Sequence, residues 1–173
     1  MLNVKLKDMP VSAGSEPLEA SMYPARLVGL YDIGDHSSQW GNKRQMVAMF
    51  ELPTEASEDE DGTTRPRLLS TFYNLLPYFS AKAKVNELTD SLGLKQSETY
   101  ADLLGRACQI DVIAKTNDGK TVNRIASVSK LGKGMDVAEP MSTLTVVSEE
   151  SWGNLDNIDM PDWIKEKIGE RIQ

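Results

Sequence analysis

Two residues of this 173-residue chain have side chains that often act together in nucleophilic catalysis, Cys108 and His36. A thiolate beside an imidazole can attack a carbonyl group. However, Cys108 lies on the apolar face of a predicted strand, and His36 lies in a Ser-rich stretch typical of a turn. The sequence has no glycine-rich phosphate loop and no zinc-ligand spacing. We therefore predict no catalytic residues, no metal site, no cofactor and no enzymatic activity.

Aromatic and basic residues occur together at the first hairpin and on the third strand, and the last hairpin adds further basic residues. This combination suits a single-stranded nucleic acid. Aromatic rings stack on bases of any sequence, and cations hold the phosphates between them. We predict that the aromatic residues Trp40, Tyr31 and Tyr73 stack on bases. The predicted phosphate ligands are Lys43, Arg44, Arg67, Lys115, Lys120 and Arg124.

Each of these residues also has a structural interpretation. Trp40 stands in a polar turn next to two cations, which favours a ligand contact, although it can also fold over one end of a barrel. Phe72 is predicted to be a core residue because it shares a strand face with Leu68 and Ser70. Tyr73 lies on the opposite face, where binding and structural roles stay open. The lysines and arginines can also serve only as solubilising charge.

The distribution of charge along the chain matters more for a ligand than the net charge of −7. Residues 22–134 carry fourteen Lys or Arg and fourteen Asp or Glu, and five of these acids stand within the short stretch 55–61. Residues 135–173 carry three Lys or Arg and nine Asp or Glu, a net charge of −6. The sequence therefore predicts a mildly basic body, an acidic loop and an acidic C-terminal tail.

The compartment is indicated by what the sequence lacks. No segment has the roughly 20 consecutive apolar residues that a membrane span needs, and the N-terminus lacks the apolar run of a signal peptide. The single cysteine excludes an internal disulfide. We expect a protein of the cytoplasm, without a membrane contact.

Hydrophobic periodicity predicts three strands, a helical connection and two further strands. The Asn117-Asp118-Gly119 sequence is a strong hairpin turn between the last two strands, and Gly29 in the first strand indicates a bulge. The expected strands are 22–34, 43–52, 65–76, 106–115 and 121–131, and the expected helices are 78–93, 98–104 and 159–173.

This order is that of an OB-fold, a five-stranded Greek-key barrel with a helical connection between strands 3 and 4. We therefore predict a mainly β protein whose OB-fold domain spans residues 22–134. A different small α+β domain is the alternative, because periodicity identifies elements and not their closure into a barrel.

The two ends of the chain are predicted to lie outside this barrel. Residues 1–21 are interpreted as a flexible arm, and residues 135–173 as an acidic, poorly structured tail that ends in a short amphipathic helix. The apolar stripe of that helix contains Trp163, Ile164, Ile168 and Ile172 and must be buried. It can pack on its own barrel, on a second subunit or on a partner.

Five segments of the chain together resemble a family of bacteriophage single-stranded DNA-binding proteins with an OB-fold. They are YPARLVGLYDIG, GNKRQMVAMFEL, LLSTFYNLL, ADLLGRACQIDVI with NRIASVSKL, and MPDWIKEKI, and they run from about residue 22 to 169. The resemblance implies a phage protein of the host cytoplasm that coats single strands during DNA replication or recombination. The extreme C-terminus, KEKIGERIQ, departs from the acidic tip of bacterial single-strand binders.

The sequence thus favours sequence-nonspecific binding and protection of single-stranded DNA. The tail is expected to contact phage replication or recombination proteins, and a homo-oligomer is possible on this sequence. The alternative is a protein-interaction adaptor that uses the OB barrel as a scaffold, has no nucleic-acid affinity and binds its partner through the C-terminal helix.

Overall fold

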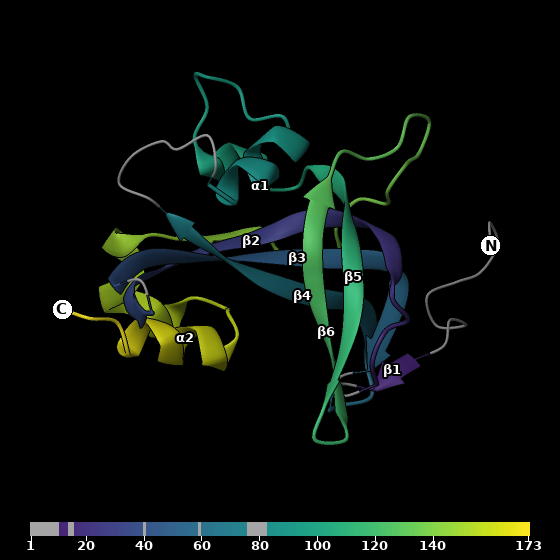
Figure 1. Cartoon of the computed structure of the whole chain (residues 1–173), viewed down its shortest axis with the longest axis horizontal. Coiled ribbons are helices and arrows are strands. Elements are labelled where there is room, and N and C mark those ends of the chain that lie inside the picture. The colour runs from purple at the N-terminus through teal and green to yellow at the C-terminus, as the bar shows by residue number, and fades with distance from the viewer. Residues whose placement is uncertain (1–10, 14–15, 40, 59, 76–82) are drawn as a thin grey trace.

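The protein is mainly β, with one sheet and a few short helices (Figure 1). The structure is a computed structural model that describes residues 11–13, 16–39, 41–58, 60–75 and 83–173. The strands are β1 (Val11–Ala13), β2 (Ser21–Ser38), β3 (Gly41–Glu58), β4 (Thr64–Leu75), β5 (Ala107–Asn117), β6 (Lys120–Ser129) and β7 (Thr145–Val147). The helices are α1 (Val85–Ser91), the 3-10 helices η2 (Tyr100–Leu103) and η3 (Glu149–Asn157), and α2 (Asp162–Gly169).

The five long strands pair in the order β4-β3-β2-β5-β6, and every one of these ladders is antiparallel. Two short strands were not predicted: β1 pairs with the end of β3, and β7 pairs with the middle of β2, both in parallel. Closure into a barrel requires β4 to pair with β6. Within the described residues no ladder joins these two strands, so closure stays a prediction.

Two of the predicted strands are longer than expected. The sequence predicts that Pro53 ends the second strand, but β3 continues to Glu58, and the predicted acidic loop begins only after it. Proline has no N–H to donate to a ladder, and it is tolerated here because the β3–β4 register is interrupted between Leu52 and Ala56. The first hairpin likewise stays paired as far as Ser38 and Gly41.

The bulge predicted at Gly29 is present, since the β2–β3 register shifts between Leu27 and Gly29. Only glycine fits here, because a Cβ atom at this position would lie 2.6 Å from the ring of Tyr31. The bulge bends the long strand β2, whose first half pairs with β5 and whose second half pairs with β3 and β7.

One apolar core lies inside the curved sheet, between the inner faces of the strands and the α1–η2 connection. Its buried members come from every long strand and from α1 and η2, and α1 contributes Leu88. The predicted helix 98–104 corresponds to the short η2, and the described part of the predicted helix 78–93 is α1. Residues 76–82 lie outside the described residues.

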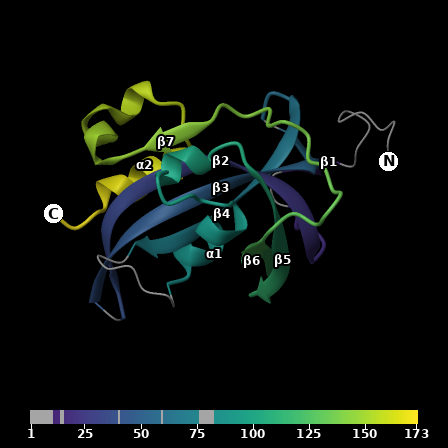
Figure 2. The same cartoon turned by 90° about the horizontal axis from the view of Figure 1, so that it is seen from above.

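A second core lies on the opposite, outer face of the sheet, where the C-terminal segment covers β2 and β3. Ile164 and Ile168 of α2 are 0% and 1% exposed, and they pack with Val28 and Ile33 of β2 and Val47 of β3. Figures 1 and 2 show α1 and α2 on opposite sides of the sheet. Of the three predicted docking places for the terminal helix, the protein's own sheet is the one observed.

The segment between β6 and β7 is tied to the outer face by two charged side chains, although the sequence predicts a poorly structured tail. Arg26 donates hydrogen bonds to the carbonyl groups of Val137 and Ala138 at 2.7 and 3.0 Å. Glu51 is fully buried, and its carboxylate accepts the N–H groups of Met141 and Ser142, both at 2.9 Å. The interpretation of this segment as poorly structured is therefore wrong for residues 137–142, whereas the predicted terminal helix is present as α2.

No helix in the described part of the chain is long and apolar enough to cross a membrane.

Candidate nucleic-acid interface

Three of the predicted phosphate ligands lie on one face of the β5–β6 hairpin. Asp118 and Gly119 take up the turn with positive φ angles of 51° and 77°, as the sequence predicted. Lys115 stands opposite Val122, and Arg124 stands opposite Ile113, so these side chains share a face with Lys120. The hairpin projects past the end of β2, because β2 pairs with β5 only as far as Val112 (Figure 1).

The charges on this hairpin are not compensated. Among the described residues, Lys115, Lys120 and Arg124 take part in no ion pair, and all three side chains are exposed. Asp118 is the one acid in the sequence of the hairpin tip, residues 115–124. In a chain with a net charge of −7, the hairpin is thus a local concentration of positive charge.

A groove of about 740 Å³ separates this hairpin from β4. One wall is formed by Arg67, Leu68 and Leu69 of β4, and the other by residues 119–123, with Pro17 also in the lining. The groove therefore lies between the two unpaired edges, β4 and β6. Exposed apolar side chains, Leu68 at 43% and Val122 at 52%, stand beside the two cations Arg67 and Lys120.

Arg67 is a more restrained cation than those of the hairpin. Its guanidinium donates a hydrogen bond to the carbonyl oxygen of Glu16. Burial lowers the pKa of Arg67, and the nearby Glu55 carboxylate acts in the opposite direction. Arg67 thus positions the N-terminal segment along the groove and still presents a charge to it.

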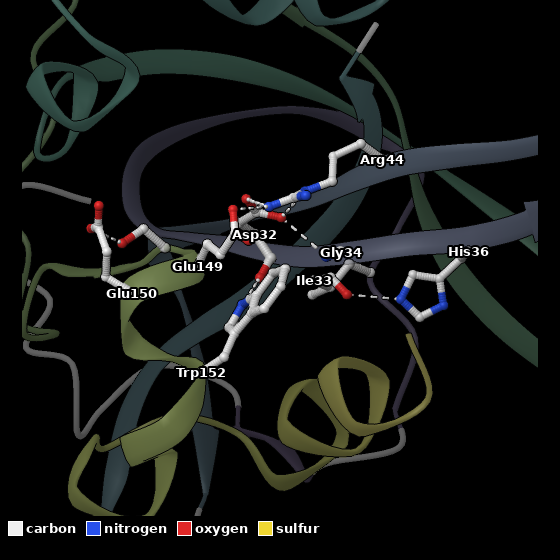
Figure 3. Close-up of polar contacts among 9 residues, drawn as sticks. Asp32, Ile33, Gly34, His36, Arg44, Glu149, Glu150 and Trp152 are labelled. Carbon is white, nitrogen blue, oxygen red and sulfur yellow. Dashed lines mark hydrogen bonds and ion pairs between the residues drawn. The ribbon is translucent and has the colours of Figure 1, made fainter. Parts of the chain in front are cut away.

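Arg44 does not belong to this interface, contrary to the prediction. Its guanidinium binds both carboxylate oxygens of Asp32, at 2.8 and 2.7 Å, and lies 3.4 Å from Glu149 (Figure 3). The hydrogen bond to Asp32 is the main reason that the pKa of Arg44 is raised. Arg44 also lies 4.9 Å from the centre of the Trp152 ring, and Arg171 lies 4.5 Å from the same ring centre. The guanidinium of Arg44 is thus paired with carboxylates of β2 and η3 and attaches η3 to the sheet.

Lys43, a predicted phosphate ligand on the first hairpin, lies near the opposite end of β2 from the groove. Lys43 stands opposite His36 near the C-terminal end of β2, whereas the β5–β6 hairpin lies beyond its N-terminal end. Lys43 is half-buried and makes no ion pair with any residue that the structure describes. Trp40 lies outside the described residues, so its predicted role stays a prediction.

Neither tyrosine is available for base stacking. Tyr31 is 5% exposed because its ring folds back over Gly29 within the second core, and Tyr73 is 1% exposed in the first core. Burial raises the pKa of both phenols. The prediction that these two rings stack on bases does not hold for this structure, because a base would have to displace core packing to reach them.

The aromatic residue that β4 does expose is Phe72, which the sequence placed in the core. Leu69 and Tyr73 point inward, so Leu68, Ser70 and Phe72 form the outer face, and Phe72 is 43% exposed. Leu68 and Val122 were not selected from the sequence because an apolar residue on a strand is usually a core residue. Their position on the two unpaired edges is visible only in the fold.

His36 and Cys108, the two residues considered for nucleophilic catalysis, each have a structural role in a different part of the fold. The Nε2 atom of His36 donates to the Ile33 carbonyl at 2.9 Å, as drawn in Figure 3. Cys108 is 0% exposed inside the first core. No group of three or more His, Cys, Asp or Glu suited to hold a metal ion occurs in the described ranges of the chain.

Cys108 should be unreactive in the folded protein. Burial raises the pKa of its thiol to about 12, so only about one molecule in ten thousand carries the thiolate at pH 8. A disulfide reagent at pH 8 should therefore modify the native protein far more slowly than the protein in denaturant. Equal rates in the two conditions would contradict the buried position.

No protein-family model matches the chain, and no curated protein matches it either.

Proposed function

We propose that the protein binds single-stranded DNA without sequence preference, and that the groove between β4 and the β5–β6 hairpin is the binding site. The observation that carries the proposal is the group of uncompensated cations, Lys115, Lys120 and Arg124, beside a groove with exposed apolar walls. Cations that line such a groove track the phosphate backbone, and apolar surface accommodates the bases. The resemblance described above supports a role in phage DNA replication or recombination.

The proposed fold type is an OB barrel. The strand order β4-β3-β2-β5-β6 supports this type, because the OB barrel has the same order with its helix between the third and fourth strands. The helices α1 and η2 occupy that connection. In this barrel the loop between the last two strands commonly contacts oligonucleotides, and here that loop is the tip of the basic hairpin.

The binding face is shifted relative to the usual one. An OB barrel commonly binds its ligand on the outer face of its second and third strands, which here are β3 and β4. The C-terminal segment covers the outer face of β3 with the second core. The groove and the outer face of β4 are therefore the open surface next to the basic hairpin.

The test is a titration of fluorescently labelled oligo-dT, about 20 nucleotides long, with duplex DNA and RNA as comparisons. We expect tight binding to oligo-dT that weakens with salt, because bound phosphates release counterions. Reversing two charges, in the Lys120→Glu, Arg124→Glu double variant, should weaken binding at least about tenfold. The plot of the logarithm of the binding constant against the logarithm of the salt concentration should also become less steep by about 1.4. Each phosphate that is no longer neutralised reduces the slope by about 0.7.

The matched control is Lys84→Glu, which reverses one exposed lysine at the start of α1. This helix lies at the other side of the sheet from the tip of the hairpin (Figure 1). The affinity of the Lys84→Glu variant for oligo-dT should stay within about twofold of the affinity of the unchanged protein. No binding of the unchanged protein at low salt, or equal binding by the charge-reversed variant, would refute the proposed site.

A second candidate function is the protein-interaction adaptor, and one observation favours it. Three large apolar side chains lie exposed on β7 and the segment that leads into it: Met141 at 68%, Leu144 at 44% and Val146 at 44%. The sequence predicts an adaptor that uses the C-terminal helix, but the isoleucines Ile164 and Ile168 of that helix are buried. A partner would therefore contact residues 141–146. Replacing Met141 and Leu144 by serine would then remove partner binding, and the unchanged protein would bind no oligonucleotide.

A further inference from the structure

The outer face of β4 carries exposed apolar side chains beside the C-terminal segment. The second core contains residues of β2 and β3 but none of β4. On β4 the side chains of Leu68, Ser70 and Phe72 point outward, and Leu68 and Phe72 are each 43% exposed. This column spans about 13 Å at about 3.3 Å per residue.

Trp163 of α2 stands beside the far end of this column. Its ring centre lies 6.0 Å from that of Phe72, with the ring planes inclined at 56°, and 37% of the residue is exposed. The helix does not need this pair for its attachment, because Ile164 and Ile168 are already buried in the second core. The two neighbouring aromatic residues therefore keep part of their surface exposed.

The column is continuous with the proposed DNA groove. Leu68 lines the groove together with Lys120 and Val122, and it is also the first residue of the column that leads to Phe72. A strand that leaves the groove along β4 therefore reaches the two rings. Asp162 and Glu166 on α2 are exposed acids, so they repel phosphates and favour an orientation in which the bases face the rings.

We propose that Phe72 and Trp163 form an aromatic platform that stacks the bases of a single strand as it leaves the groove between β4 and β6. The inference rests on the proposed function, since it extends the same binding surface. Stacking on such rings is tolerant of sequence because every base has a π-face.

The test compares oligo-dT of about 5 nucleotides, a length for the groove alone, with oligo-dT of about 20 nucleotides, which spans groove and platform. The Phe72→Leu, Trp163→Leu double variant keeps apolar side chains but has no rings. We expect it to bind the long oligonucleotide at least about tenfold more weakly and the short one with unchanged affinity. The Phe72→Tyr, Trp163→Phe variant keeps both rings and should bind both like the unchanged protein.

Thermal unfolding of each variant shows whether the substitutions change its stability. If the double variant does not fold, the single variant Phe72→Leu is the milder substitution to test. Loss of long-strand affinity in the leucine variants, restored by the aromatic ones, would establish the platform. Unchanged affinity in the leucine variants would overturn the platform while the groove proposal stands. Equal losses for both lengths would also overturn it, and failure of the unchanged protein to bind any oligonucleotide would overturn the proposed function itself.

Discussion

Replacing Ile164 by alanine should lower the free energy of unfolding by about 2–5 kcal/mol, the range found when a large aliphatic side chain is removed from a core. Ile164 is 0% exposed and packs in the second core against residues of β2 and β3. The cavity would open between α2 and the sheet, where the surrounding side chains have little means to close it. Urea unfolding followed by circular dichroism measures the difference.

The control for this substitution is Ile172→Ala. Ile172 belongs to the same predicted apolar stripe, but it is 40% exposed, and its link to the sheet is a backbone hydrogen bond to Asp35 that alanine keeps. The Ile172→Ala substitution should lower the free energy of unfolding by less than about 1 kcal/mol. If both substitutions cost the same, α2 is not held by the second core.

Replacing Glu51 by alanine should destabilise the protein by about 2–4 kcal/mol. The carboxylate accepts three hydrogen bonds from the segment before β7: the N–H groups of Met141 and Ser142 at 2.9 Å and the Ser142 hydroxyl at 2.7 Å. Alanine leaves these donors without an acceptor, and each unsatisfied group costs about 1–3 kcal/mol unless water reaches it. Hydrogen exchange at the amides of Met141 and Ser142 should accelerate in the variant.

Glu139→Ala is the matched control for the loss of an acid. The Glu139 side chain is 87% exposed, and its ion pair with Arg26 spans 3.4 Å at the surface. Exposed pairs of this kind contribute about 0–1 kcal/mol. Protection of the Met141 amide should therefore survive in Glu139→Ala, and its loss there would show that Glu51 is not the attachment point.

The order of the main elements could be predicted because each carries a local signal. The Asn117-Asp118-Gly119 turn fixes the last hairpin, and Gly29 marks the bulge that bends β2. The three cations of the hairpin, Lys115, Lys120 and Arg124, could be grouped for the same reason, since a hairpin of known turn has a known register.

The orientation of β4 could not be predicted, because both of its faces carry apolar residues. The pairs Leu68–Leu69 and Phe72–Tyr73 erase the alternation that identifies an inner face. The inner face meets the first core, and the outer face lies next to α2, a helix that follows almost ninety residues later. Only the fold shows that Tyr73 is the buried member of its pair and Phe72 the exposed one.

The fate of Arg44 and of the tail depended on contacts between distant parts of the chain. Asp32 and Arg44 are twelve residues apart and meet only because of the hairpin register. Glu51 binds backbone N–H groups ninety residues away. Backbone partners leave no trace in the pattern of side chains, so residues 135–144 have no periodicity and their sequence predicts a loose segment.

The second core can form only late in the synthesis of the chain, because its strands and its covering helix are far apart in the sequence. Ile33 on β2 and Ile164 on α2 are about 130 residues apart, and ribosomes add about 5–20 residues per second. The outer face of β2 and β3 thus emerges roughly 7–26 seconds before its cover. Stalled nascent chains that end before residue 145 should bind a hydrophobic dye or a chaperone more strongly than released protein. Slow translation of the codons for residues 144–173 would prolong that exposure.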